Sequence, residues 1–162
     1  MKKQILGKTG YEIGRVVYGG IVSANLYGDT VMPGDGQKDS DRYVSWAVER
    51  GVNYFDVAPS YGNAEEMLGN SLLPYRKQVY LACKTGLRDA EGAEKELLRS
   101  LSRLHTDYFD VYQLHAVSSL EFVEPLVAIS KNCNVKNSPY NQLMFEREAR
   151  VLEILIADEL LK

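Results

Sequence analysis

The chain has 162 residues, of which 45% are hydrophobic and 25% are charged, and its formal net charge at pH 7 is −3. This length suits a single domain covering residues 1–162, and the composition is that of an ordinary globular protein. The weak negative charge argues against a nucleic acid or a membrane surface as a partner, because both require a clustered positive face.

The cysteines and the N-terminus bear on the cellular compartment. Cys83 and Cys133 show no spacing typical of a metal site, so no metal is expected, and two thiols suit a reducing cytoplasm. The opening stretch "MKKQILGKTGYEIG" lacks the apolar segment of a secretory signal. No apolar run approaches the roughly 20 residues that a membrane span needs. We therefore expect a cytoplasmic protein.

The first predicted elements are a hairpin, a strand and a helix. "QIL" and "YEIGRVV" flank the turn "GKTG", and "RVVYGG" predicts a strand near 16–20 that ends in a glycine pair. A polar loop is expected over 21–39. A helix follows in "SDRYVSWAVERG", with Gly51 as its C-cap candidate. Its residues at helical spacing are Tyr43, Trp46, Ala47 and Val48.

Strands and helices then alternate. The predicted strands cover 52–58, 78–84 and 107–115, and the predicted helices cover about 63–72, about 89–105 and a segment from Ser118. Asn63 and Glu66 have the spacing of a capping box. The second helix has one apolar face formed by Leu97, Leu101 and Leu104. This alternation predicts an α/β fold with parallel strands covered by helices.

The pattern weakens after Leu126. "VAISKNCNVKNSPYN" contains one or two short strand candidates, one of them near 133–138. A final helix is expected in "NQLMFEREARVLEILIADELLK", with an apolar face of Leu152, Leu155 and Ile156.

Three successive predicted strands end in an ionisable residue: Asp56, Lys84 and His115. Each interval is close to the roughly 30 residues of one βα unit. Equal register would therefore place the three side chains at the same end of neighbouring parallel strands, which is where active sites form in (β/α)8 barrels. Each residue alone is more often a cap, a solvated lysine or a structural histidine, so the shared register carries the hypothesis.

Tyr61 lies in the turn directly after Asp56, and the four residues together suggest acid catalysis. A tyrosine alone is a weak acid at neutral pH, and a neighbouring ammonium such as that of Lys84 favours its ionised form. Asp56 can hold Lys84 charged and oriented, and His115 can donate a hydrogen bond to a substrate carbonyl. None of the four supplies a hydride, so a reduction needs a cofactor.

These stretches resemble the aldo-keto reductase family. The resemblance covers about residues 3–126 and rests on four ordered blocks: "GKTGYEIGRVVYGG", "GVNYFDVAPSYGNAEEMLG", "LACKTG" and "LLRSLSRLHTDYFDVYQLH". It implies a (β/α)8 TIM-type barrel that reduces a small aldehyde or ketone with NADPH or NADH, of which we favour NADP(H). It also implies catalytic roles for Asp56, Tyr61, Lys84 and His115, with Tyr61 as the general acid.

The resemblance further implies the cofactor contacts. "VKNSPYNQLMFEREA" resembles the sixth strand of the family and the loop after it, where Asn137 would face the nicotinamide. The expected cofactor-binding residues are Gly20, Ile21, Asp56 and Asn137. A second alignment takes "VAIS" as a remnant of the fifth strand, and both alignments remain open.

The chain is about half as long as family members, and a barrel of this type needs roughly 250 residues. We therefore expect an incomplete barrel of about five βα units plus the hairpin. Either residues of a longer protein are missing between Leu126 and Tyr140 and after Lys162, or a partner covers the opening, with self-association if the chain really is this short. The alternative functions are a non-catalytic remnant acting as an interaction module, and a lyase that uses Lys84 to form a Schiff base.

Overall fold

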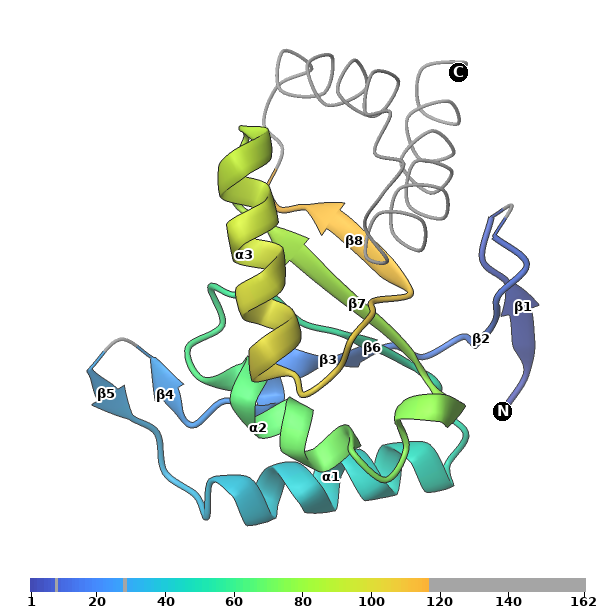
Figure 1. The fold of residues 1–162 in the computed structure, drawn as a ribbon. Coiled ribbons are helices and arrows are strands. Elements are labelled where there is room, and N and C mark those ends of the chain that lie inside the picture. Colours follow the sequence, from blue (N-terminus) through green and yellow to red (C-terminus); the bar gives the residue numbers. More distant parts are fainter. Residues whose placement is uncertain (8, 28, 117–162) are drawn as a thin grey trace.

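The computed structural model describes residues 1–116 except 8 and 28, and it begins with a hairpin (Figure 1). Strands β1 (Lys3–Ile5) and β2 (Glu12–Gly14) pair antiparallel, as the two runs around "GKTG" predict. The hairpin lies where the later strands begin: the ring of Tyr11 stacks on that of Tyr80 at 4.6 Å between centroids. The Asn53 side chain also accepts a hydrogen bond from the Gly14 N–H at 2.8 Å.

The centre of the fold is a four-stranded parallel sheet with the order β3-β6-β7-β8. Its strands are β3 (Tyr18–Gly19), β6 (Tyr54–Asp56), β7 (Tyr80–Thr85) and β8 (Val111–Leu114). Strands β3, β6 and β8 lie inside the segments predicted as strands, and β7 extends one residue beyond its predicted end. The order follows the chain, as in a barrel built from successive βα units.

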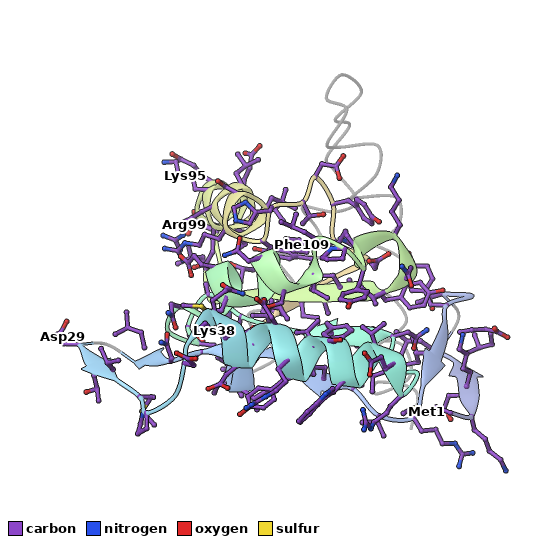
Figure 2. The ribbon with its side chains drawn as sticks, turned by 90° about the horizontal axis from the view of Figure 1, so that it is seen from below. Met1, Asp29, Lys38, Lys95, Arg99 and Phe109 are labelled. Carbon is purple, nitrogen blue, oxygen red and sulfur yellow. The ribbon has the colours of Figure 1, made fainter. Side chains whose placement is uncertain are left out.

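The segment between β3 and the first α-helix was predicted as a loop, and it contains regular structure. A 3₁₀ turn, η1 (Gly20–Ser23), follows β3, and β4 (Leu26–Tyr27) pairs antiparallel with β5 (Thr30–Val31). Figure 1 shows β4 and β5 extending away from the sheet, and Figure 2 shows Asp29 at their tip. Strands of two residues give too weak a pattern in sequence to be predicted.

Helix α1 (Gln37–Glu49) begins three residues before the predicted start, and it ends as predicted. Gly51 has φ +85°, its N–H donates to the Val48 carbonyl at 2.9 Å, and the Val52 N–H donates to the Ala47 carbonyl at 3.0 Å. This is the Schellman arrangement, which favours glycine because its positive φ strains other residues.

Helices α2 (Ala64–Leu72) and α3 (Ala90–Arg103) complete the layer that covers the sheet, and η2 (Arg76–Gln78) follows α2 (Figure 1). Helix α3 starts with a side-chain cap, since the Asp89 carboxylate accepts the Gly92 N–H at 2.8 Å. Lys95 and Arg99 lie on its outer side, away from the sheet (Figure 2).

The two faces of the sheet have different partners. Outward-pointing residues of β6 and β7, including Phe55, Leu81 and Cys83, are buried against the helices. The helical residues in this core are Val44, Ala64, Leu68, Leu72, Leu97 and Leu101, and Leu104 joins them directly after α3, so the predicted apolar face is confirmed. The opposite face holds Tyr54, Ala82 and Val111 with Ile13 of the hairpin. Period-two alternation therefore separates a helix-facing side from an inner side.

The expected capping box of α2 was wrong. Asn63 does not cap α2, because its side-chain oxygen instead accepts the N–H groups of Asn25 and Leu26, both at 3.0 Å. Glu66 bonds Arg103 Nε at 3.1 Å rather than closing a capping box. In both cases a partner distant in sequence replaces the local one.

None of the helices in the described part of the chain has the length and apolar character needed to cross a bilayer. Several expectations fall outside the described residues. They are the helix from Ser118, the strand near 133–138, the final helix, Asn137, Cys133 and the continuity of the chain between Leu126 and Tyr140.

Candidate active site

Asp56, Lys84 and His115 lie at the carboxyl ends of β6, β7 and β8, but not in equal register. Asp56 pairs with Ala82, and Lys84 pairs with Gln113, so each polar residue lies two positions further along than its neighbour on the previous strand. A step of two residues keeps all three on the inner face, away from the helices. The expectation of equal register was therefore wrong. The three side chains still lie at the same end and on the same face of the sheet, because the stagger between neighbouring strands is two residues.

An ion pair joins the first two residues. Lys84 Nζ lies 2.5 Å from Asp56 Oδ2 and donates a second hydrogen bond to the Val57 carbonyl at 3.2 Å. The two side chains are only 12% and 26% exposed, so the carboxylate compensates an ammonium that has lost most of its water. An ammonium has three donors, and those two bonds are the ones it makes within the described residues. The third remains available to a group above the strand ends.

Tyr61 lies in the turn that follows β6, above the ion pair. The turn is closed by hydrogen bonds from the Tyr61 N–H to the Ala58 carbonyl at 3.1 Å and from the Ala64 N–H to the Tyr61 carbonyl at 3.0 Å. Gly62 has φ +59°, a conformation that glycine adopts without strain. Lys84 Nζ lies 5.6 Å from the centroid of the Tyr61 ring. The ammonium is thus near both Asp56 and Tyr61, as their spacing in the sequence predicts.

His115 is the first residue after β8, and it completes the cluster. Its backbone N–H donates to the Thr85 carbonyl at 2.8 Å, which continues the β7–β8 pairing. Its ring meets the Tyr61 ring edge-on, with 5.7 Å between centroids and 85° between planes. Ser60 Oγ lies 3.4 Å from His115 Nδ1. The four residues proposed for catalysis therefore converge on one region.

The segment after β3 lies beside Asp56. Gly19 pairs with Asp56, and a Cβ on Gly19 would meet no atom within 4 Å, so there is open space beside the carboxylate. A Cβ on Gly20 would lie 2.9 Å from the Asp56 carbonyl oxygen, so Gly20 is required for close packing against β6. Ile21 is 42% exposed on the same segment. The space above Gly19, on the Asp56 side of the ion pair, is therefore open.

Sequence reasoning missed several contacts that support the site. Asn63 fastens the segment after β3 to the Tyr61 turn. Glu96 of α3 accepts hydrogen bonds from the Thr85 hydroxyl at 2.7 Å and from the Gly86 N–H at 2.9 Å, and so holds the end of β7. Arg88 contacts the backbone around His115. Their partners lie 10 to 38 residues away, and no local spacing signals such pairs.

Cys83 is adjacent to Lys84 but faces the helices. Burial, and next the Glu65 carboxylate, raise the pKa of its thiol. The thiol is therefore protonated and poorly reactive. Across the part of the chain that the structure describes, no group of three or more His, Cys, Asp or Glu side chains is placed to hold a metal ion.

Comparison with known proteins identifies the class to which this fold and site belong. The model of the aldo/keto reductase family matches residues 30–135, so the chain belongs to this family. Its parallel sheet with helices on one face is part of the (β/α)8 barrel that the solved relatives adopt. The predicted family and fold class are thereby confirmed.

Two curated relatives illustrate the range of similarity. The chain is 33% identical over 155 residues to the aldo-keto reductase YhdN of Bacillus subtilis, covering 87% of this chain and 44% of the relative. It is 38% identical over 88 residues to the methylglyoxal reductase YeaE of Escherichia coli, covering 52% of this chain and 31% of the relative. The chain thus spans less than half the length of these two proteins.

Solved structures give the same result. An aldo-keto reductase from Bacillus halodurans, in its holo form, matches with a TM-score of 0.60 at 28% identity, over 81% of this chain and 47% of that one. A Pseudomonas aeruginosa protein assigned to the aldo-keto reductases matches with a TM-score of 0.67 at 26% identity, over 80% of this chain and 55% of that one.

Proposed function

We propose that the protein catalyses the NAD(P)H-dependent reduction of an aldehyde or ketone to an alcohol. The observation that carries this proposal is the Lys84–Asp56 ion pair at 2.5 Å, on the inner face of the sheet and beneath the Tyr61 ring. An almost desolvated ammonium beside a phenol is suited to stabilising a negative charge on that phenol. Family membership supports the same reaction class.

Tyr61 acts as the general acid. When bound, a nicotinamide cofactor would supply the hydride that this reduction needs. As the carbon–oxygen double bond becomes a single bond, the oxygen takes the proton of the Tyr61 hydroxyl, and the neutral alcohol results. Lys84 stabilises the phenolate that remains, Asp56 keeps Lys84 charged and in place, and water then restores the proton.

His115 orients the substrate. With the proton on Nε2, its imidazole donates a hydrogen bond to the carbonyl oxygen, and Nδ1 then accepts one from the Ser60 hydroxyl. Such a donor also withdraws electron density from the carbonyl carbon, which favours hydride addition.

Gly20, Ile21 and Asp56 would hold the nicotinamide cofactor beside the ion pair, and the family resemblance adds Asn137 to the expected cofactor-binding residues. We favour NADP(H) over NAD(H), a cytoplasmic location and a small carbonyl substrate. The name of one relative, a methylglyoxal reductase, supports a small oxoaldehyde as the first compound to test.

The experiment is a cofactor-oxidation assay with NADPH and NADH against methylglyoxal, an aromatic aldehyde and an aldose. Tyr61→Phe is compared with Tyr75→Phe, which removes the same oxygen atom from a tyrosine at the far end of α2. We expect carbonyl-dependent oxidation that falls at least about 100-fold in Tyr61→Phe and changes little in Tyr75→Phe. Equal activity in the two variants would exclude Tyr61 as the acid. No turnover with either cofactor would favour the non-catalytic interaction module.

A further inference from the structure

Arg88, in the loop between β7 and α3, bonds the backbone at the ends of two strands. Its Nη1 donates to the carbonyls of Thr85 and Leu87, both at 3.3 Å. Its Nη2 donates to the carbonyl of His115 at 2.5 Å and to that of Ala116 at 3.5 Å. Hydrogen bonds from a charged donor are stronger than neutral ones, and the planar guanidinium fixes the direction of each. One side chain therefore ties the end of β7 to the residues after β8.

The backbone that Arg88 binds is in an unfavourable conformation. Ala116 has φ +52°, in the left-handed region, where a residue with a Cβ is strained. Other contacts must compensate this strain. Arg88 Nη2 donates to the carbonyl just before Ala116 and to the carbonyl of Ala116 itself. The guanidinium therefore stabilises the backbone at the strained residue.

The position of this backbone determines where the His115 ring lies. An imidazole is joined to its backbone by only two rotatable bonds, so a shift of the Cα moves the ring nearly as far. The ring must meet the edge of Tyr61 at 5.7 Å and reach Ser60 at 3.4 Å. The His115 N–H bond to Thr85 fixes the near side of this residue, and Arg88 fixes its carbonyl side.

We propose that Arg88 is a positioning residue, whose bonds to the carbonyls of His115 and Ala116 hold the His115 imidazole against Tyr61 in the orientation that binds a substrate carbonyl. This inference rests on the proposed function for its catalytic consequence, but its geometric content does not. The hydrogen bonds described above join Arg88 to backbone carbonyls, one of them that of His115, so it acts on the site through His115.

The decisive experiment is NMR of the protein with isotope-labelled histidine, which gives only two imidazole signals because the chain has two histidines. His105 lies beyond the other end of α3 and serves as an internal reference. In Arg88→Met we expect the His115 signals to move and the cross-relaxation between the His115 and Tyr61 rings to disappear, with His105 unchanged. Arg42→Met, which removes an exposed arginine of α1, is the matched control and should leave both signals in place.

Unchanged His115 signals and retained cross-relaxation in Arg88→Met would overturn the proposal. If Arg88→Met does not fold, Arg88→Lys decides the matter, because a lysine keeps the charge but cannot bridge the two strand ends. Displacement of His115 in folded Arg88→Lys supports the proposal, and an unmoved His115 overturns it.

Kinetics supply the second readout. We expect Arg88→Met to lower kcat by roughly 10- to 100-fold, the effect of moving a catalytic group by about 1 Å, and to leave the KM for cofactor little changed. If the proposed function is wrong, the unaltered protein will show no turnover although its His115–Tyr61 contact is intact. Failure of the Arg88 inference would appear as an unmoved His115 in the variant, so the two failures are distinguishable.

Discussion

Removal of Arg103 should destabilise the protein far more than removal of an exposed cation on the same helix. Arg103 Nη1 lies 3.0 Å from Glu65 Oε2, and the Glu65 side chain is only 1% exposed. The other Glu65 oxygen receives only a weak bond from the Cys83 thiol at 3.6 Å. Arg103→Met therefore leaves a buried carboxylate without a cation between α2 and α3.

The magnitude follows from the burial of the two partners. Breaking a fully buried ion pair costs about 3–5 kcal/mol. Because Arg103 is 35% exposed, water reaches part of the pair, and we reduce this figure to about 2–3 kcal/mol. The second bond of Arg103, to Glu66 at 3.1 Å, adds little because the Glu66 side chain is 45% exposed.

Urea denaturation measures the effect, with Lys95→Met as the matched control. Lys95 pairs with Glu91, and both side chains are more than 70% exposed, so that change should cost less than about 1 kcal/mol. Glu65→Gln combined with Arg103→Met should recover part of the loss, since a buried amide carries no charge. An Arg103→Met cost equal to that of Lys95→Met, or no recovery in the double variant, would refute this reasoning.

Three further predictions concern stability. Gly69→Ala should destabilise by about 1–3 kcal/mol in urea, because its Cβ would lie 2.7 Å from the backbone at the end of α3, and a gain of stability would contradict this. The free energy of unfolding should fall above about pH 9, because the Cys83 thiol ionises in the unfolded chain and stays protonated in the folded one. The expected slope is up to about 1.4 kcal/mol per pH unit, and Cys83→Ala should reduce it. An unchanged slope in that variant would contradict this prediction. Asn63→Ala should cost about 1–3 kcal/mol through two unpaired N–H groups, measured against an exposed Asn70→Ala control, and equal costs would contradict it.

The sequence predicts the convergence of Asp56, Lys84 and His115 because one βα unit separates each from the next. The two-residue stagger between them is not predictable in this way. It depends on how far neighbouring strands shift as the sheet tilts, and that shift is a property of the whole sheet.

The helix α1 illustrates a second limit. Its apolar periodicity predicts a helix correctly, but not the side that is buried. Val44 is fully buried, whereas Tyr43 and Trp46 are 37% and 50% exposed. The Arg42 guanidinium lies 5.2 Å and 5.4 Å from the centres of these two rings, so a charged side chain covers aromatic surface that the pattern alone assigns to the core.

The supporting contacts around the site mark a third limit. Arg88 lies next to Asp89 at the start of α3, a place where a charged residue usually faces solvent. Its acceptors at His115 are 27 residues away and are backbone carbonyls, which every sequence provides. Only the fold specifies which carbonyl meets which donor.

The central claim is that Tyr61 and Lys84 act as one acid, with Asp56 behind them. The most direct test is the single-turnover rate of hydride transfer to a carbonyl substrate in Tyr61→Phe, Lys84→Met and the double variant. We predict that each single change lowers the rate by about 10²- to 10⁴-fold. The rate of the double variant should lie within a few-fold of that of the slower single variant, because the effects of residues that act as a unit are not additive. Two losses that multiply in the double variant, or a near-normal rate in Lys84→Met, would contradict the account.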